Sequence, residues 1–460
     1  MTGSAIIHSP AAEDLKPECQ NGVEMERPLD TDESTGWVED CDHPRNWPKW
    51  KKNAQILMVS FHSMGASFMA AGIIPVYEAM AEEYGVTVDA ATYLTATQIL
   101  ILGVAPVFWK PFTTIYGRYP ILLFSVFGCM VCNLGGAFCS SYGAQMVTRV
   151  FAAICVCPPL GVGTGVITDL CEPHERAQKL GWWALLLTMG TPAGPLIMGF
   201  VSGNLGWHWV FYILALLNFV QFMLYVLLGD ETIYPADRSL RIKNGGGFFA
   251  KYRFRRLNAC PLTKYNFVEP LFASKYPRII IPIFAQSIVF CYANIAIIVE
   301  MPSVFGQKFG LNAQQIGLQF LAVIIGSLME NSWQGLHLTG FATAMAGLLT
   351  WGFQLDNASS TWNVTPLIGV AIASFGNQIV MTILISFSVD SHPELATGVG
   401  ICLSVYRQLY GFVPPFYLPA MFKALDFAKA ARVMYVLIVV AALIPIIAIH
   451  VAASHHRAAA

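Results

Sequence analysis

Residues 181–199 read GWWALLLTMGTPAGPLIMG, and this stretch decides the fold class. It contains no charged residue and is as long as the roughly 20 apolar residues with which a helix crosses a bilayer. Small residues let two helices approach closely in lipid, and a proline removes one backbone donor and bends the helix. The stretch places such residues at Gly181, Gly190, Gly194, Pro195 and Gly199. It therefore predicts a membrane-spanning helix, and an ordinary packing face is the simplest use of its glycines.

The composition of the whole chain also indicates a membrane protein. Hydrophobic residues make up 55% of the 460 positions and charged residues 12%, against about 25% charged residues in a soluble domain. The net charge of −1 excludes the basic footprint of a nucleic-acid-binding protein. The sequence contains no phosphate-binding loop, nucleophile–base pattern or metal-ligand spacing. An enzyme, a cofactor and a metal site are therefore not expected.

Apolar runs of similar length recur along the chain, six on each side of a polar, basic loop at 230–278. They lie at 54–79, 91–109, 120–140, 146–168, 180–202, 208–228, 279–301, 314–330, 337–354, 366–387, 395–418 and 432–452. We predict an all-α integral membrane protein of 12 helices, in two six-helix bundles at 54–229 and 279–452. The run at 314–330 reaches only about 25 Å, so helix 8 and the loop after it are expected to be shortened.

The distribution of basic residues predicts the orientation. Segments assigned to the cytoplasm hold 21 of the 27 Lys and Arg residues, whereas outer loops hold 4. The tails at 1–53 and 453–460 are therefore expected in the cytoplasm, and the polar, acidic N-terminal tail is expected to be partly disordered. The outer loop near residue 360 contains two acceptor patterns for N-glycosylation, at Asn357 and Asn363. Such tripeptides are common, so they support the orientation weakly.

Several stretches, in order along the chain, carry a resemblance to a known family. The spacing of glycines and proline in 181–199 resembles the antiporter motif of major facilitator drug exporters. The N-terminal approach to the first helix, 43-HPRNWPKWKK-52, and the stretch 229-GDETIYP-235 resemble fungal 12-helix drug:proton antiporters. The same holds for 406-YRQLYGFVPPFYLP-419. The chain therefore resembles the major facilitator superfamily over roughly residues 40–450.

The loop signature of that family is only half present. The stretch 110-KPFTTIYGRYP-120 keeps Gly117 and Arg118 but has Lys110, Thr114 and Ile115 where the family has a glycine, an acid and a basic residue. In the family the charged half steadies the outward-facing state. A remaining gating contact is expected between Arg118 and Asp169 at the inner face, although a solvated Asp169 is the simpler interpretation.

Three ionisable residues within the predicted helices are candidates for transport or coupling, because burial of such groups is costly in a membrane. Arg149 falls where the family has its membrane-buried arginine, and Arg407 lies near the midplane of helix 11. His62 is able to carry a proton near neutral pH. For each of them, helix packing is the alternative. No carboxylate is predicted at the midplane, which weakens proton coupling without excluding it.

Neutral polar and aromatic residues are expected to line the pathway, although hydrogen bonding between helices is an alternative use for the amides. The candidates are Gln98, Asn133, Asn294, Tyr292, Asn377, Gln378, Tyr406 and Tyr410.

The resemblance implies a secondary transporter that exports small amphipathic compounds such as drugs, toxins or secondary metabolites. Proton antiport with alternating access, a fungal plasma membrane and a monomer are the expected setting. Protons, the small-molecule substrate and lipid are the expected partners. An importer of a small nutrient or organic cation, or a truncated protein without transport activity, remain the alternatives.

Overall fold

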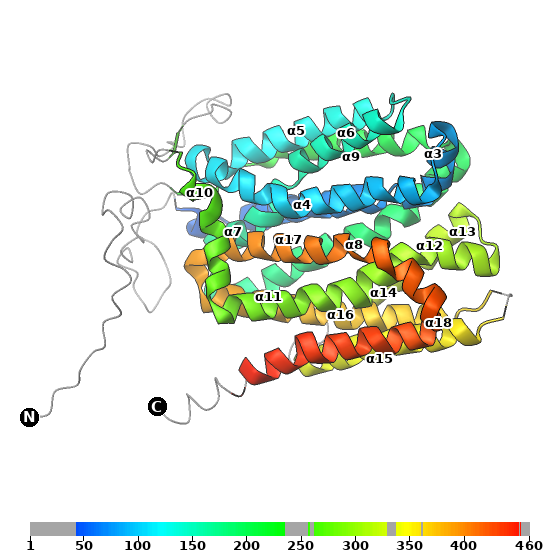
Figure 1. Cartoon of the computed structure of the whole chain (residues 1–460). Helices are drawn as coiled ribbons and strands as arrows, with labels where there is room; N and C mark the ends of the chain where they lie inside the picture. Colours follow the sequence, from blue (N-terminus) through cyan, green and yellow to red (C-terminus); the bar gives the residue numbers. More distant parts are fainter. Residues whose placement is uncertain are drawn as a thin grey trace, which may run out of the picture.

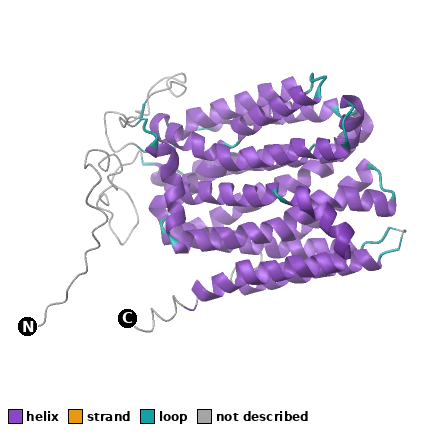
Figure 2. Cartoon of the chain, in the orientation of Figure 1, coloured by secondary structure: helices purple, strands orange, loops and turns teal. Residues whose placement is uncertain are grey.

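The computed structural model describes residues 43–234, 256–257, 262–328, 337–359, 362–449 and 451, and all regular elements in this part are helices (Figures 1 and 2). Of these helices, 9 are long and apolar enough to cross a membrane. Shorter apolar helices lie beside them, among them the run Gln314–Leu328. The predicted all-α membrane architecture is therefore confirmed at this level.

The N-terminal half of the described helices runs from residue 49 to 228. Its helices are α2 (Lys49–Ala71), α3 (Tyr77–Tyr84), α4 (Val88–Tyr116), α5 (Arg118–Gly136), α6 (Tyr142–Val156), α7 (Pro158–Leu170), α8 (Pro173–Leu205) and α9 (His208–Leu228). The short α10 (Tyr265–Val268) lies before the C-terminal half. Figure 1 shows the long helices side by side, crossing the molecule in the same general direction.

The C-terminal half runs from residue 277 to 449. Its helices are α11 (Pro277–Phe290), α12 (Ala296–Phe309), α13 (Ala313–Gln319), α14 (Leu321–Leu328), α15 (His337–Asn357), α16 (Thr365–Ser391), α17 (Ala396–Phe412) and α18 (Pro414–Ile438). The expected helix at 314–330 is divided at Phe320, and its last two residues lie outside the described part.

The start of the last membrane helix differs from the prediction of residue 432. A sharp kink at Asp426, where φ is 59°, divides α18 into two helical pieces. The Asp356 carboxylate, at the end of α15, accepts hydrogen bonds from the backbone N–H groups of Phe427 at 3.0 Å and Ala428 at 2.7 Å. A carboxylate in this position satisfies free donors of a helix N-terminus. The second piece therefore starts at Phe427, five residues before the apolar run that the sequence displays.

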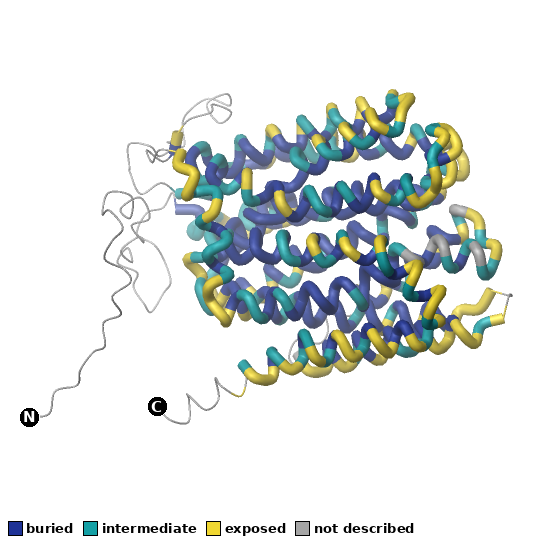
Figure 3. The backbone as a smooth tube through the Cα atoms, viewed as in Figure 1, coloured by how far each residue is buried: buried dark blue, intermediate teal, exposed yellow. Residues whose placement is uncertain are grey.

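Burial follows the expectation for a protein in lipid. Residues that face other helices are buried, whereas many on the outside are exposed (Figure 3). Large apolar residues are among the exposed ones. Phe151 is 55% exposed and Leu216 is 59% exposed, although both lie within apolar helices. A water-soluble protein seldom exposes apolar side chains so widely, and a bilayer removes this cost.

The closest helix contact in the N-terminal half joins α8 to α2. A Cβ atom added at Gly194 would lie 2.8 Å from the Phe68 carbonyl oxygen and 2.9 Å from the Gly72 nitrogen. At Gly190 a Cβ would lie 2.8 Å from the Phe68 nitrogen and would also meet the Met64 carbonyl oxygen. Glycine is required at both places because the obstructing atoms belong to the α2 backbone.

Candidate functional site

A small cavity lies between the two halves, and residues of both halves line it. It has a volume of about 30 Å³, roughly the space of one water molecule. Apolar walls come from residues such as Ile99, Leu102 and Ile298, and polar groups from Ser67, Thr95, Thr191, Arg407 and Gln408. Residues of α2, α4 and α8 thus face residues of α11, α12 and α17 across the cavity.

Pro195 lies one turn of α8 after the cavity-lining Thr191. Its ring nitrogen has no hydrogen, so the carbonyl of Thr191 one turn earlier loses its ordinary helical partner. Thr191 itself lines the cavity. The helix α8 nevertheless runs unbroken from Pro173 to Leu205. The proline of the predicted antiporter motif therefore leaves the carbonyl of a cavity-lining residue without its helical donor.

Arg407 is the charged residue that lines the cavity. Its side chain is buried, with 3% of the residue exposed. One Nη lies 3.7 Å from the Met381 sulfur, and the guanidinium lies 4.0 Å from the centre of the Phe290 ring. Within the described part of the chain its Nε has no hydrogen-bond partner.

Arg149 lies deeper in the N-terminal half and does not line the cavity. Its Nη1 donates to the carbonyl of Met69 at 3.1 Å and to the Gln98 side chain at 2.9 Å. The guanidinium also lies 4.8 Å from the centre of the Phe211 ring. The sequence predicts Arg149 as a coupling residue and Gln98 as a residue that lines the pathway. The structure brings these two side chains into direct contact.

His62 is held between two hydroxyl groups. Its Nδ1 lies 3.2 Å from the Tyr225 hydroxyl and its Nε2 lies 3.3 Å from the Ser125 hydroxyl. The histidine therefore sits inside the N-terminal half, between α2, α5 and α9, away from the cavity lining. A coupling role for His62 stays a prediction, and the contacts favour the packing alternative.

The eight polar and aromatic residues predicted to line the pathway are not among the lining residues of this cavity. Asn133 donates to the carbonyl of Cys129 at 3.0 Å within its own helix. Asn294, Asn377 and Gln378 are buried, and their side-chain nitrogen and oxygen atoms have no hydrogen-bond partner in the described part of the chain. Burying an amide without a hydrogen-bond partner costs free energy, so these three side chains suit a space that fills with water or ligand in another state of the protein. The three tyrosines predicted to line the pathway, Tyr292, Tyr406 and Tyr410, are partly buried.

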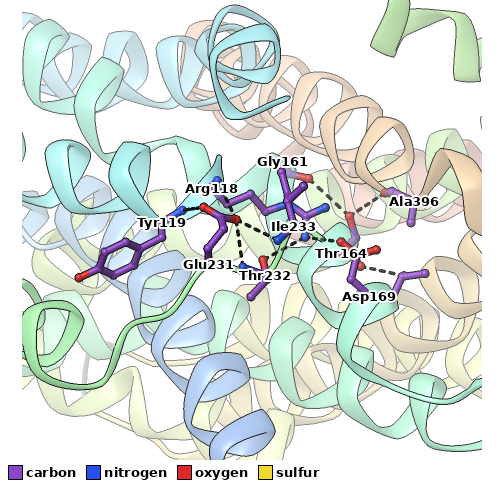
Figure 4. Close-up of polar contacts among 10 residues, drawn as sticks. Arg118, Tyr119, Gly161, Thr164, Asp169, Glu231, Thr232, Ile233 and Ala396 are labelled. Carbon is purple, nitrogen blue, oxygen red and sulfur yellow. Dashed lines mark hydrogen bonds and ion pairs between the residues drawn. The ribbon is translucent and has the colours of Figure 1, made fainter. Parts of the chain in front are cut away.

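We call the end of the molecule that carries Arg118, Asp169 and Arg176 the basic end. Arg118 starts α5 directly after Gly117, whose φ of +92° is one that residues with a side chain rarely adopt. Its Nη1 lies 2.6 Å from an oxygen of Asp169, on α7, and 3.3 Å from the Thr232 hydroxyl. The expected partner of Arg118 is therefore in contact with it (Figure 4).

Glu231 is the third charged residue of this cluster, and the sequence alone does not predict a role for it. Its carboxylate accepts hydrogen bonds from the backbone N–H groups of Arg118 at 3.2 Å and Tyr119 at 3.0 Å, the first residues of α5 (Figure 4). It also accepts from those of Thr232 and Ile233. Burial raises the pKa of the Glu231 carboxyl above its usual value, and these N–H donors and the Arg118 charge oppose the rise.

The two halves also touch at the basic end. The Thr164 hydroxyl, on α7, donates to the Ala396 carbonyl at the start of α17 at 2.7 Å (Figure 4). Gly161 and Gly400 let α7 and α17 lie close together, since a Cβ at Gly161 would lie 2.7 Å from the Ile401 side chain and a Cβ at Gly400 would lie 2.6 Å from the Gly161 carbonyl oxygen. Arg176 lies 3.5 Å from Asp390, which joins α8 to α16.

The two halves also contact each other at the far end. The rings of Tyr93 and Phe416 stack with their centres 5.5 Å apart. A Cβ at Gly317, on α13, would lie 3.1 Å from the Pro195 carbonyl on α8. The two halves therefore contact each other at both ends of the helices, on either side of the central cavity.

We expect reversal of Asp390 to arginine to weaken closure at the basic end, because Arg176 then faces a second cation. The Arg176 side chain is buried but that of Asp390 is 47% exposed, so the effect should be modest, about threefold in transport rate, in line with an ion pair worth below about 1 kcal/mol. The double variant with Arg176→Asp and Asp390→Arg should recover most of the rate. Equal defects in the single and double variants would show that the pair has no part in closure.

The sequence profile of the Major Facilitator Superfamily matches residues 57–415. The chain is 26% identical over 376 residues to the "Trichosetin biosynthesis cluster MFS transporter" of Gibberella fujikuroi, covering 80% of this chain and 76% of that protein. It is 24% identical over 432 residues to "Efflux pump vrtL" of Penicillium aethiopicum, covering 85% and 83%. With "MFS transporter fsa7" of a Fusarium species it shares 26% identity over 324 residues, or 68% of this chain and 63% of that protein.

Solved structures share the arrangement of helices at low sequence identity. The proton:xylose symporter XylE superposes with a TM-score of 0.64 at 14% identity, covering 86% of this chain and 95% of that one. The human organic anion transporter MFSD10 superposes with a TM-score of 0.61 at 14% identity, covering 87% and 100%. At this identity the likeness concerns the fold alone.

Proposed function

Because this chain belongs to the major facilitator superfamily, a family of membrane transporters and not of enzymes, we propose that it exports small amphipathic organic compounds from a fungal cell. The two halves rock against each other, so that the central site faces one side of the membrane at a time. The observation that carries the proposal is the cavity that residues of both halves line, including the buried Arg407. Relatives named as efflux pumps support the outward direction.

We assign the basic end to the cytoplasmic side of the plasma membrane. Lys and Arg concentrate there, as the positive-inside rule requires. The Arg118–Asp169–Glu231 cluster and the Thr164–Ala396 contact then form the inner gate. Proton antiport is the coupling that the sequence resemblance implies. Among the side chains that the structure describes, no carboxylate lies in the middle of a membrane-spanning helix, so Arg149, Arg407 and His62 remain the candidates for coupling.

Export is tested in inside-out vesicles from a drug-sensitive yeast that expresses this chain. A pH gradient, acidic inside the vesicle, is imposed, and a panel of uncharged, cationic and anionic amphipathic compounds is offered. Accumulation of at least one compound that empty-vector vesicles lack is the expected result, and loss on collapse of the gradient supports proton antiport. Arg149→Ala should abolish it, since the contacts with Met69 and Gln98 join two helices to α6. Movement only out of the vesicles would indicate import.

The proposed orientation predicts glycans at the far end. Asn357, the last residue of α15, and Asn363, two residues before α16, are exposed. Figure 1 shows the connection between α15 and α16 at the end of the molecule opposite α10. Endoglycosidase should therefore shift the protein on a gel, and the double variant Asn357→Gln with Asn363→Gln should show no shift. The orientation is wrong if the wild type is unmodified and a cysteine introduced at Asn363 reacts with an impermeant maleimide only after the cells are permeabilised.

A further inference from the structure

Arg407 differs from the other membrane-buried arginine in what surrounds its charge. The Nη1 of Arg149 donates hydrogen bonds to two oxygen atoms, those of Met69 and Gln98, while its Nε and Nη2 have no partner in the described part of the chain. Arg407 contacts only a thioether sulfur and the face of an aromatic ring, and the structure assigns it no oxygen acceptor in the described part of the chain. Arginine keeps its proton in proteins, so the cavity wall carries a positive charge.

The contacts of Arg407 are too weak to balance that charge. A thioether is a weak acceptor, and a cation–π contact returns only part of the solvation that a guanidinium loses on burial. A buried cation without a matching anion is costly in a membrane protein and marks a site that an anion completes. Planar guanidinium groups bind carboxylates with two parallel hydrogen bonds.

The other residues that line the cavity indicate which kind of anion would bind there. The Phe290 ring lies beside the guanidinium, and Ile99, Leu102 and Ile298 supply apolar surface. The hydroxyls of Ser67 and Thr95 already donate to backbone carbonyls of neighbouring residues. The polar groups of Thr191 and Gln408 complete the lining. In this structure the cavity has room for about one water molecule, so a larger compound enters only when the halves move apart. One cation among mainly apolar walls then suits a compound with one negative charge on an apolar or aromatic body.

We infer that Arg407 is the substrate-binding cation of this transporter and that its substrates are amphipathic organic monoanions, carboxylates in the first place. This inference rests on the proposed export function. It also identifies a driving force, because a cell interior is electrically negative and the membrane potential draws a monoanion outward. Export of such a compound therefore needs no proton-binding carboxylate at the midplane.

The binding test uses a pair of probes that differ in charge and share a ring system, 2-naphthoate and 2-naphthamide. The purified full-length protein is titrated with each, and its thermal unfolding temperature is followed. We expect naphthoate to bind at least tenfold more tightly than naphthamide. Arg407→Gln should remove this preference, and Arg407→Lys should keep part of it because the charge remains. Met381→Leu, which removes the sulfur contact and keeps the charge, is the control and should retain the preference.

The transport test uses inside-out vesicles with a potassium diffusion potential, positive inside and without a pH gradient. Naphthoate should accumulate, and Arg407→Gln should reduce its accumulation at least tenfold, while the unfolding temperature of the unliganded variant reports whether it is folded. Equal binding of the acid and the amide, or binding of neither, overturns the inference. In that case accumulation of uncharged or cationic compounds in the export test leaves the proposed function standing. If no compound accumulates in either test while naphthoate still binds through Arg407, the export function fails and the anion site stands.

Discussion

Gly194→Leu should prevent the folded transporter from accumulating in the membrane. The new side chain would start 2.8 Å from the Phe68 carbonyl and 2.9 Å from the Gly72 nitrogen, both atoms of the α2 backbone. A backbone segment cannot rotate away as a side chain can, so α2 and α8 must separate. Overpacking a core in which the neighbouring side chains can shift already costs about 1–3 kcal/mol of folding free energy. Here the neighbouring atoms belong to the backbone, so we expect a loss of at least about 3 kcal/mol. Fluorescence-detected size-exclusion chromatography of the solubilised protein should show little monodisperse protein.

The matched controls for this prediction are single alanines on the same pair of helices. A Cβ at Gly65, on α2, meets no atom within 4 Å, so Gly65→Ala should leave the unfolding temperature unchanged or raise it slightly through helix propensity. Gly194→Ala should lower the unfolding temperature clearly, because the same Cβ meets the α2 backbone. If the two alanine variants are equally stable, the α2–α8 contact does not require a glycine at residue 194.

The contrast between Gly194 and Gly65 also explains what the sequence is able to predict about the fold. Helices were recognisable because a bilayer demands long apolar runs, and the glycines of 181–199 indicated close packing without naming the partner helix. The contact with α2 depends on the tertiary arrangement, which one sequence does not encode locally. The same reason explains the misplaced start of the last helix: Asp356, 71 residues away in the chain, caps it at Phe427.

The candidate site was predictable to a similar degree. Buried arginines stood out because charges are rare inside apolar runs, but the sequence did not distinguish Arg149, which has oxygen partners, from Arg407, which does not. The family's loop signature has its acid at the position of Thr114, whose hydroxyl here accepts a hydrogen bond from Lys110 at 3.1 Å. The acid that serves the start of α5 is Glu231, 113 residues after Arg118. The quoted stretch GDETIYP contained it, and only the fold brings it to that helix.

Glu231→Ala should have the largest effect among variants of the inner gate. The wild-type carboxylate accepts the N–H groups of Arg118 and Tyr119 and lies next to the Arg118 charge, which also holds Asp169. Removal leaves the first donors of α5 without an acceptor and frees the loop that carries Thr232. Loss of a comparable helix cap costs about 0.5–2 kcal/mol, and a buried unpaired donor adds a similar amount. We therefore expect transport to fall at least tenfold in a protein that still folds.

The position of the gate makes the cause of that loss measurable. Thr397 lies at the basic end, where its hydroxyl and Arg118 both crowd Gly165. A cysteine introduced at Thr397, in a background without other reactive cysteines, should be protected from an impermeant maleimide in wild-type inside-out vesicles. Adding Glu231→Ala should expose it, whereas Glu231→Asp should protect it partly, because a shorter carboxylate still offers acceptors and charge. Slow transport with full protection of the cysteine would mean that Glu231 supports the fold of α5 and takes no part in closing the inner gate.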